Sequence, residues 1–218
     1  SILIRGCSFL LPYEAGVLRA LQELSPDLLK SASRIYGASS GSLVATFALC
    51  GRDISKSYAL LFILCLKSVL KTTFGWWLPG RSAVKILRDV LNHFLPTNAH
   101  QLVYGKLHVI ITRVHDWRSV TVSEFASRED LIQALVCSCF VPVYFGLSVP
   151  VYHGVRYVDG ELGMWRANFV SQSTITISAF AGEYDICPKD SPAAFFSFHI
   201  SDCTLQLTKR NICRFQSI

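Results

Sequence analysis

Early in the chain the sequence reads Arg34-Ile35-Tyr36-Gly37-Ala38-Ser39-Ser40-Gly41-Ser42-Leu43-Val44. The segment from Gly37 to Gly41 has the pattern G-x-S-x-G, whose small flanking residues allow a sharp turn around the serine. A short apolar run precedes this turn, and an apolar segment reaching Leu49 follows it, which predicts a strand, a turn and a buried helix. Because a nucleophile elbow has that order, Ser39 is the candidate nucleophile.

The composition indicates a globular chain with a large core. The 218 residues suit a single domain, and 51% hydrophobic against 17% charged residues excludes a disordered polymer. The net charge of +6 favours anionic surfaces such as phospholipid headgroups. No run of Lys and Arg and no basic stripe interleaved with aromatic residues occurs, so nucleic acid is not an expected partner.

The cysteines and the chain ends give two further expectations. None of the eight cysteines forms a C-x-x-C pair, and most lie in apolar runs where Cys acts as a small hydrophobic residue. We therefore expect reduced thiols in an intracellular compartment, without a metal site. The chain starts at Ser1 without a methionine, and we expect residues 1–218 to be one catalytic domain truncated at both ends.

Helical and strand patterns alternate along the chain, which predicts an α/β sandwich. The expected strands are 2–4, 34–36, 107–112, 120–122, 151–157 and 174–179. The expected helices are one starting at Pro12, then 42–49, 83–94 and 128–139. The apolar segment 57–70 predicts either a core helix or an element open to lipid, and 74–79 either a packed or a membrane-interfacial loop.

The base that would activate Ser39 has two candidates by spacing alone. His199 follows the serine in chain order, as in α/β-hydrolases, although a lone His in an apolar strand is more often a core residue. Asp159 precedes Gly160 and could project from a strand end into a cleft, although Asp-Gly is commonly a plain turn. Spacing leaves both candidates open.

Separated motifs along nearly the whole chain carry a family resemblance. They are Gly6-Cys7-Ser8-Phe9-Leu10, Tyr13 with Gly16, Gly37-Ala38-Ser39-Ser40-Gly41, Ser138-Cys139-Phe140-Val141-Pro142-Val143-Tyr144, Asp159-Gly160 and Asp185-Ile186-Cys187-Pro188. In this order they resemble the patatin-like phospholipase domain. The motif sequences are similar to those of the animal branch that contains adipose triglyceride lipase, adiponutrin and an ω-hydroxyceramide transacylase.

The resemblance implies a fold and a site. The fold would be a three-layer α/β/α sandwich with a mostly parallel central sheet. The site would be a Ser-Asp dyad, with Ser39 as nucleophile and Asp159 as proton acceptor, in place of a His-containing triad. Backbone N–H groups at Gly6, Cys7 and Ser8 would form the oxyanion loop, and no cofactor or metal is implied.

The resemblance also implies an activity. It is that of a serine lipid acyl hydrolase or transacylase, acting through an acyl-enzyme on triacylglycerol or related lipid esters, with ω-hydroxyceramide as a possible acceptor. The resemblance also implies a cytoplasmic location on lipid droplets or intracellular membranes. A protein co-activator is a further implied partner.

Three residues depart from the family pattern. Ser8 and Leu11 replace the second and third glycines of G-x-G-x-x-G, and Glu161 follows Asp-Gly where Gly or Ala is usual. A serine forced to positive φ would cost about 1 kcal/mol or more. A carboxylate at Glu161 close to Asp159 would raise the proton affinity of Asp159. These departures keep a second function open, a catalytically weakened lipid-binding protein of a lipid droplet or membrane surface with a degraded oxyanion loop.

Overall fold

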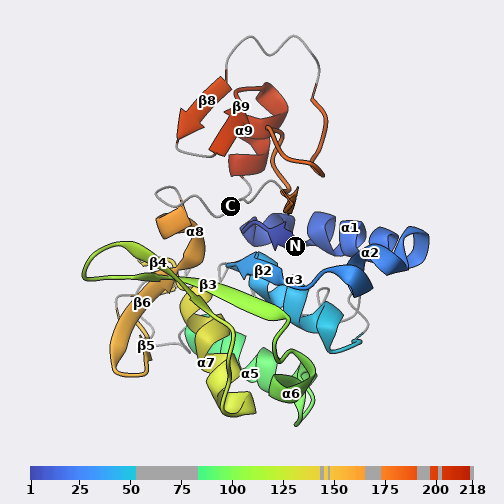
Figure 1. The fold of residues 1–218 in the computed structure, drawn as a ribbon. Helices are drawn as coiled ribbons and strands as arrows, with labels where there is room; N and C mark the ends of the chain where they lie inside the picture. Colours follow the sequence, from blue (N-terminus) through green and yellow to red (C-terminus); the bar gives the residue numbers. More distant parts are fainter. Residues whose placement is uncertain are drawn as a thin grey trace.

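The computed structural model describes residues 1–52, 83–142, 145–146, 148–164, 173–190, 197–200 and 203–216. The predicted segments 57–70 and 74–79 lie outside the described residues. In the described ranges, helices surround a central sheet (Figure 1). A hairpin of β8 (Ser197–Ile200) and β9 (Cys203–Gln206) with helix α9 (Lys209–Gln216) lies above the sheet in the view of Figure 1. The prediction of an α/β sandwich is confirmed.

A mixed sheet forms the middle layer. Its strands are β1 (Ile2–Ile4), β2 (Ile35–Ala38), β3 (Leu107–Arg113), β4 (Arg118–Val122), β5 (Val151–Tyr152), β6 (Val155–Asp159) and β7 (Ile175–Ile177). Hydrogen-bonded neighbours follow one another in the order β5-β6-β3-β2-β1-β7, and β4 also pairs with β3. Strands β7, β1, β2 and β3 run parallel, whereas β4 and β6 are antiparallel to β3.

Strand β3 pairs with three other strands, β2, β4 and β6. Strand β4 pairs with Val109–Arg113 along one edge of β3. Both β2 and β6 pair with residues that β4 also pairs with, so β2 and β6 share the opposite edge of β3 end to end. Along that edge Ala38 is opposite Ile110, and Asp159 is opposite the next residue, Ile111.

The helices lie on both sides of the sheet. They are α1 (Leu11–Leu24), α2 (Pro26–Ser31), α3 (Ser40–Leu49), α5 (Ala83–Phe94), α6 (Ala99–Leu102), α7 (Arg128–Ser138), α8 (Gly160–Met164) and α9 (Lys209–Gln216), with a 3₁₀ turn η1 (Ser8–Leu10) before α1. Helices α3, α5, α6 and α7 lie below the sheet in the view of Figure 1, and α8 lies above it. The sheet therefore has helices on both faces.

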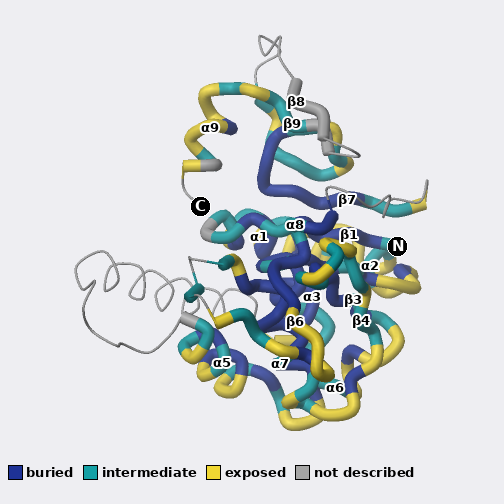
Figure 2. The backbone as a smooth tube through the Cα atoms, turned by 90° about the vertical axis from the view of Figure 1, so that its left-hand side faces the viewer, coloured by how far each residue is buried: buried dark blue, intermediate teal, exposed yellow. Residues whose placement is uncertain are grey.

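The core is centred on β1, β2, β3 and α3. Figure 2 shows buried backbone through the middle of the molecule and exposed backbone at its outer turns. All three residues of β1 are at most 1% exposed, and Phe47 of α3 is fully buried. Parallel strands covered on both faces read as continuous apolar runs, which explains why β1 has no polar alternation.

One predicted strand is wrong. The expected strand 151–157 is a hairpin, in which β5 ends at Tyr152 and β6 starts at Val155. The intervening His153 and Gly154 have φ of 45° and 80°. Two positive φ values in succession suit a two-residue turn between antiparallel strands. Because valine and tyrosine lie on both sides of this turn, the apolar pattern runs through it, and a histidine is not a usual signal for positive φ.

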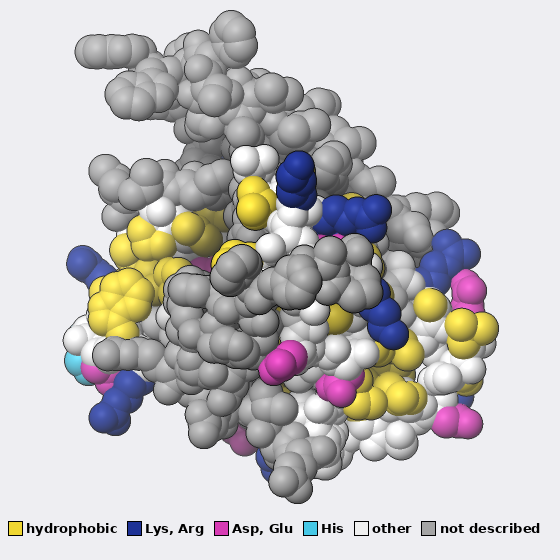
Figure 3. Space-filling view, turned by 90° about the horizontal axis from the view of Figure 1, so that it is seen from above, with side chains coloured by type: hydrophobic (Ala, Val, Ile, Leu, Met, Phe, Trp, Pro, Cys, Tyr) yellow, Lys and Arg dark blue, Asp and Glu magenta, His cyan; other side chains and the backbone are white. Residues whose placement is uncertain are grey.

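The described surface mixes apolar and charged side chains. Figure 3 shows hydrophobic groups beside lysine and arginine on the face seen from above, with acidic groups between them. Among the described residues, Leu24 and Tyr104 are the most exposed large apolar residues, at 83% and 65%. Among the described residues, no helix combines the length and the apolar character that a membrane span requires.

Candidate active site

Ser39 occupies a strained turn between β2 and α3. Its φ of 52° and ψ of −130° lie in a region that residues other than glycine seldom adopt. The Ser39 carbonyl accepts hydrogen bonds from the backbone N–H and the hydroxyl of Ser42, at 3.0 and 2.6 Å. The strand, turn and helix predicted for an elbow are therefore present, and their contacts hold the strained backbone in place.

Ser138 ties this turn to the sheet. Its hydroxyl accepts the Ser39 backbone N–H at 2.9 Å and donates to the Ile110 carbonyl at 2.7 Å. Ser138 is fully buried at the end of α7. In the sequence it stood out only as the first residue of a family motif, and spacing gave no sign that it contacts the nucleophile.

The motif glycines allow close backbone approaches. A Cβ at Gly37 would lie 2.5 Å from Ser42 Cα, and one at Gly41 would lie 2.4 Å from the Ile4 carbonyl oxygen. A Cβ at Gly160 would lie 2.2 Å from the Ile110 carbonyl oxygen. Since each obstacle is backbone, a larger residue at these positions would displace the strands that carry the site.

Asp159 is the last residue of β6 and is 2% exposed. Its backbone N–H donates to the Phe140 carbonyl at 2.8 Å, and its carboxylate Oδ1 accepts the Glu161 N–H at 2.8 Å. Burial raises the pKa of Asp159 to about 7, although hydrogen bonds from the Ser39 side chain and the Glu161 N–H lower it and the Glu161 charge raises it. Asp159 therefore meets Ser39 as a carboxyl group that titrates near neutrality.

The two readings of the base can now be compared. Asp159 ends a strand and Gly160 begins α8, so the Asp-Gly pair is not a plain turn. His199 lies in β8 (Ser197–Ile200), opposite Thr204 of β9 (Cys203–Gln206), and its side chain is outside the described part of the structure. Only Asp159 is therefore seen beside Ser39.

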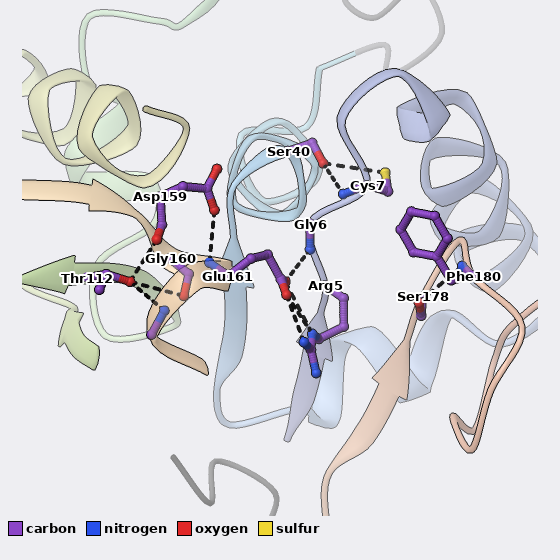
Figure 4. Close-up of polar contacts among 11 residues, drawn as sticks. Arg5, Gly6, Cys7, Ser40, Thr112, Asp159, Gly160, Glu161, Ser178 and Phe180 are labelled. Atoms are coloured by element: carbon purple, nitrogen blue, oxygen red, sulfur yellow. Dashed lines mark hydrogen bonds and ion pairs between the residues drawn. The ribbon is translucent and has the colours of Figure 1, made fainter. Parts of the chain in front are cut away.

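The predicted oxyanion loop follows β1, and the N–H groups of Gly6 and Cys7 have partners within the chain. The Gly6 N–H donates to Glu161 Oε1, and the Cys7 N–H donates to the Ser40 hydroxyl at 2.8 Å (Figure 4). Ser8 has a φ of 48°, the conformation for which a glycine was expected. Glu161 also pairs with Arg5 at 2.7 Å, a contact that the sequence gave no reason to expect.

A second carboxyl group lies beneath the loop. Glu14 of α1 is fully buried, and neither of its oxygens has a hydrogen-bond partner. Burial is the main reason that the pKa of Glu14 lies well above its ordinary value. Burial and the Glu14 charge likewise hold the pKa of the Cys7 thiol well above its ordinary value. Cys7 is therefore not an activated thiol.

The family motif that begins at Asp185 has a structural role. The Asp185 carboxylate accepts the backbone N–H and the hydroxyl of Thr176 at 2.7 and 2.8 Å. These hydrogen bonds lower the pKa of Asp185. The segment after β7 is thereby fastened to the sheet. Among the described residues no group of three or more His, Cys, Asp or Glu side chains is arranged to hold a metal ion.

Comparison with known proteins identifies the class. A family model described as patatin-like phospholipase matches residues 2–166. This match covers most of the chain and includes both the Ser39 turn and Asp159. The chain belongs to the patatin-like phospholipase family.

Curated relatives extend over almost all of the chain. An ω-hydroxyceramide transacylase from Homo sapiens is 43% identical over 215 residues, which is 98% of this chain and 40% of the relative. The human 1-acylglycerol-3-phosphate O-acyltransferase PNPLA3 is 40% identical, covering 97% of this chain and 44% of the relative. Human patatin-like phospholipase domain-containing protein 2 is 40% identical, covering 98% and 42%. The chain thus spans less than half the length of these relatives.

Proposed function

We propose that the protein is a serine lipid acyl hydrolase or transacylase in which Ser39 and Asp159 form the catalytic dyad. The observation that carries the proposal is the register on β3, where Ala38 before the nucleophile and Asp159 are opposite consecutive residues. The strained dihedrals of Ser39 and the titration of Asp159 near pH 7 support it, because a general base works best when its pKa is close to the working pH.

The reaction has two half-steps. The Ser39 hydroxyl attacks the ester carbonyl carbon while Asp159 takes its proton, and the tetrahedral intermediate collapses to the acyl-enzyme. The departing alkoxide receives that proton from Asp159 and leaves as an alcohol. Water or a lipid hydroxyl then gives a proton to Asp159 and attacks the acyl-enzyme, and the proton returns to Ser39.

The substrate we propose is triacylglycerol or a related lipid ester, with ω-hydroxyceramide as an alternative acyl acceptor. The named activities of the relatives, an ω-hydroxyceramide transacylase and a 1-acylglycerol-3-phosphate acyltransferase, support acyl transfer between lipids. The proposed setting is the cytoplasmic face of lipid droplets or intracellular membranes, together with a protein co-activator. The net charge of +6 and the exposed apolar side chains suit such an anionic, lipid-rich surface.

Labelling with a fluorophosphonate probe tests the dyad. The intact protein should be labelled at Ser39, whereas Ser39→Ala and Asp159→Asn should not be labelled. The exposed Ser33→Ala is the matched control and should label as the parent does. Absence of labelling in the parent at any pH, or retention of labelling in Ser39→Ala, would refute the proposal. His199→Ala should label normally, and its failure with the fold intact would restore the histidine base.

A second candidate function is favoured by the oxyanion loop. Because the N–H groups of Gly6 and Cys7 have partners within the chain, the protein could bind lipid at a droplet surface with little catalysis. This candidate predicts flotation with lipid emulsions by a protein that the probe does not label. Labelling at Ser39 would decide for the enzyme.

A further inference from the structure

The Glu161 side chain points away from Asp159 and toward the residues that follow β1 (Figure 4). Its backbone N–H donates to Asp159, but its carboxylate points to Arg5 and Gly6 (Figure 4). The Arg5 Nε lies 3.1 Å from each Glu161 oxygen, and Arg5 Nη2 lies 2.7 Å from Oε2. Glu161 therefore joins the base to the predicted oxyanion loop across a sequence separation of 156 residues.

The Arg5–Glu161 salt bridge is more buried than an ordinary surface salt bridge. The Arg5 side chain is 9% exposed and the Glu161 side chain 21% exposed. The Arg5 guanidinium also lies over the Tyr184 ring, 5.8 Å from its centroid. A two-pronged contact between guanidinium and carboxylate fixes the carboxylate in orientation as well as position. Glu161 Oε1 is thereby kept on the Gly6 N–H.

The same carboxylate lies next to the nucleophile. A Cβ built on Gly6 would be 2.7 Å from both Glu161 Cγ and Ser39 Cβ, so both side chains approach the same side of Gly6. During acyl transfer the negative oxygen forms on the carbon bonded to Ser39 Oγ, and N–H groups must point to that oxygen. Glu161 offers the Gly6 N–H a negative oxygen before any substrate arrives.

We propose that Glu161 is a built-in competitor of the reaction's oxyanion, clamped by Arg5, and that it limits the rate at which Ser39 is acylated. This inference rests on the proposed function, because it requires Ser39 to be the nucleophile. Glu161 must leave Gly6 before that N–H can stabilise the intermediate. Since loss of one oxyanion donor costs roughly 10²–10³ in kcat elsewhere, removing the carboxylate should restore about tenfold or more.

The test compares two variants that lose the same salt bridge. Glu161→Gly alone would take the carboxylate away from the buried Arg5 guanidinium, so it is combined with Arg5→Met. Arg5→Met alone is the matched control, because it breaks the pair and keeps the carboxylate. We expect the double variant to react with the fluorophosphonate probe at least about tenfold faster than the parent. Arg5→Met releases the clamp but keeps the competing carboxylate, so its gain should be clearly smaller than that of the double variant.

A third variant separates charge from occupancy. Glu161→Gln keeps an oxygen for the Gly6 N–H but removes the charge that raises the pKa of Asp159. Its labelling rate should therefore reach half-maximum at lower pH than in the parent, with a smaller gain in maximum rate than the double variant shows. A purely structural role for Glu161 would leave that midpoint unchanged.

The outcomes keep the two proposals apart. Equal labelling rates in the parent and in the folded double variant would overturn the inference while leaving Ser39 as the nucleophile. A rate gain in Arg5→Met equal to that of the double variant would also overturn it, because the gain would then not depend on removing the Glu161 carboxylate. If neither the parent nor any variant is labelled at Ser39, the proposed function itself fails.

Discussion

Burial is the main cause of the raised pKa of Asp159, the proposed base. The carboxyl is 2% exposed, and loss of hydration raises its pKa to about 7 despite hydrogen bonds that favour the charged form. A carboxylate with an ordinary pKa would be too weak a base to take a proton from a serine hydroxyl efficiently at neutral pH. The position of Asp159 at the covered end of β6 therefore matters as much as its chemical type.

The rate of acylation should consequently depend on pH. Only the deprotonated form of Asp159 can accept the Ser39 proton, so the rate of fluorophosphonate labelling should rise with pH through an apparent pKa of about 7. Asp116→Asn is a suitable control. Asp116 pairs with Arg113, which lowers the pKa of Asp116 to about 2, so this group does not titrate near pH 7. A rate that is constant or falls between pH 5 and 9 would contradict the assignment.

Ser138 offers a second test at the scale of a residue. Ser138→Ala removes the acceptor of the Ser39 N–H and the donor to the Ile110 carbonyl, both in the interior. The free energy of unfolding should fall by about 1–3 kcal/mol, and labelling should slow because the strained turn is less restrained. Urea denaturation and probe kinetics measure the two effects. An unchanged labelling rate would show that Ser138 does not position the nucleophile.

At the scale of the element, one buried amide attaches α9 to the segment after β7 and to the end of β9. Asn211 is 1% exposed, and it accepts the Ala181 N–H at 2.9 Å while donating to the Ala181 and Gln206 carbonyls at 2.7 and 2.8 Å. The Arg214 guanidinium adds a pair to Asp190 at 2.9 Å. Polar contacts therefore fix the position of this helix, whose described residues bury little else.

Loss of that amide should loosen the C-terminal part. Asn211→Ala removes the acceptor of the buried Ala181 N–H, so the free energy of unfolding should fall by about 1–3 kcal/mol. Asn92→Ala, at an exposed amide that pairs with Arg128, should change it by less than about 0.5 kcal/mol. Amide hydrogen exchange should rise first in β9 and α9. Equal effects of the two substitutions would contradict this account of α9.

Most elements could be predicted because their apolar periods are strong. Helix α5 begins and ends where the pattern predicted, and Ser39 lies between strand and helix as expected. The hairpin turn at His153 could not be predicted, since its positive φ depends on the strand pairing and not on side-chain type. The Arg5–Glu161 pair was equally invisible, because periodicity reports neighbours along an element and not partners 156 residues apart.

At the scale of the whole molecule, two buried carboxyl groups act on stability together. The pKa of Glu14 is raised well above 4.5 and that of Asp159 is raised from 3.8 to about 7. An acid whose pKa is raised by folding holds its proton in the native state after the unfolded chain has lost it. The free energy of unfolding should therefore fall as pH rises from the unfolded values towards the folded ones.

Glu14→Gln isolates one of these contributions. Glutamine cannot ionise, so the variant should gain stability over the parent, and the gain should grow as pH rises above about 4.5. Glu23→Gln in the same helix is the control, because Glu23 is exposed and pairs with Arg19 at the surface. Chemical denaturation at several pH values measures both. A gain that is independent of pH would show that Glu14 does not carry a raised pKa.

The shared edge of β3 has a consequence for how the chain tolerates insertions and deletions. Because Ala38, next to Ser39, and Asp159 pair with the same strand, the loops between β3 and β6 that lie outside Ser138 and Phe140 can change in length without moving either group. A single-residue slip of β6 along β3 is different, since it would turn Asp159 to the opposite face of the sheet. Loop-length variants should thus keep the dyad, whereas a one-residue deletion within β6 should abolish it in a chain that still folds.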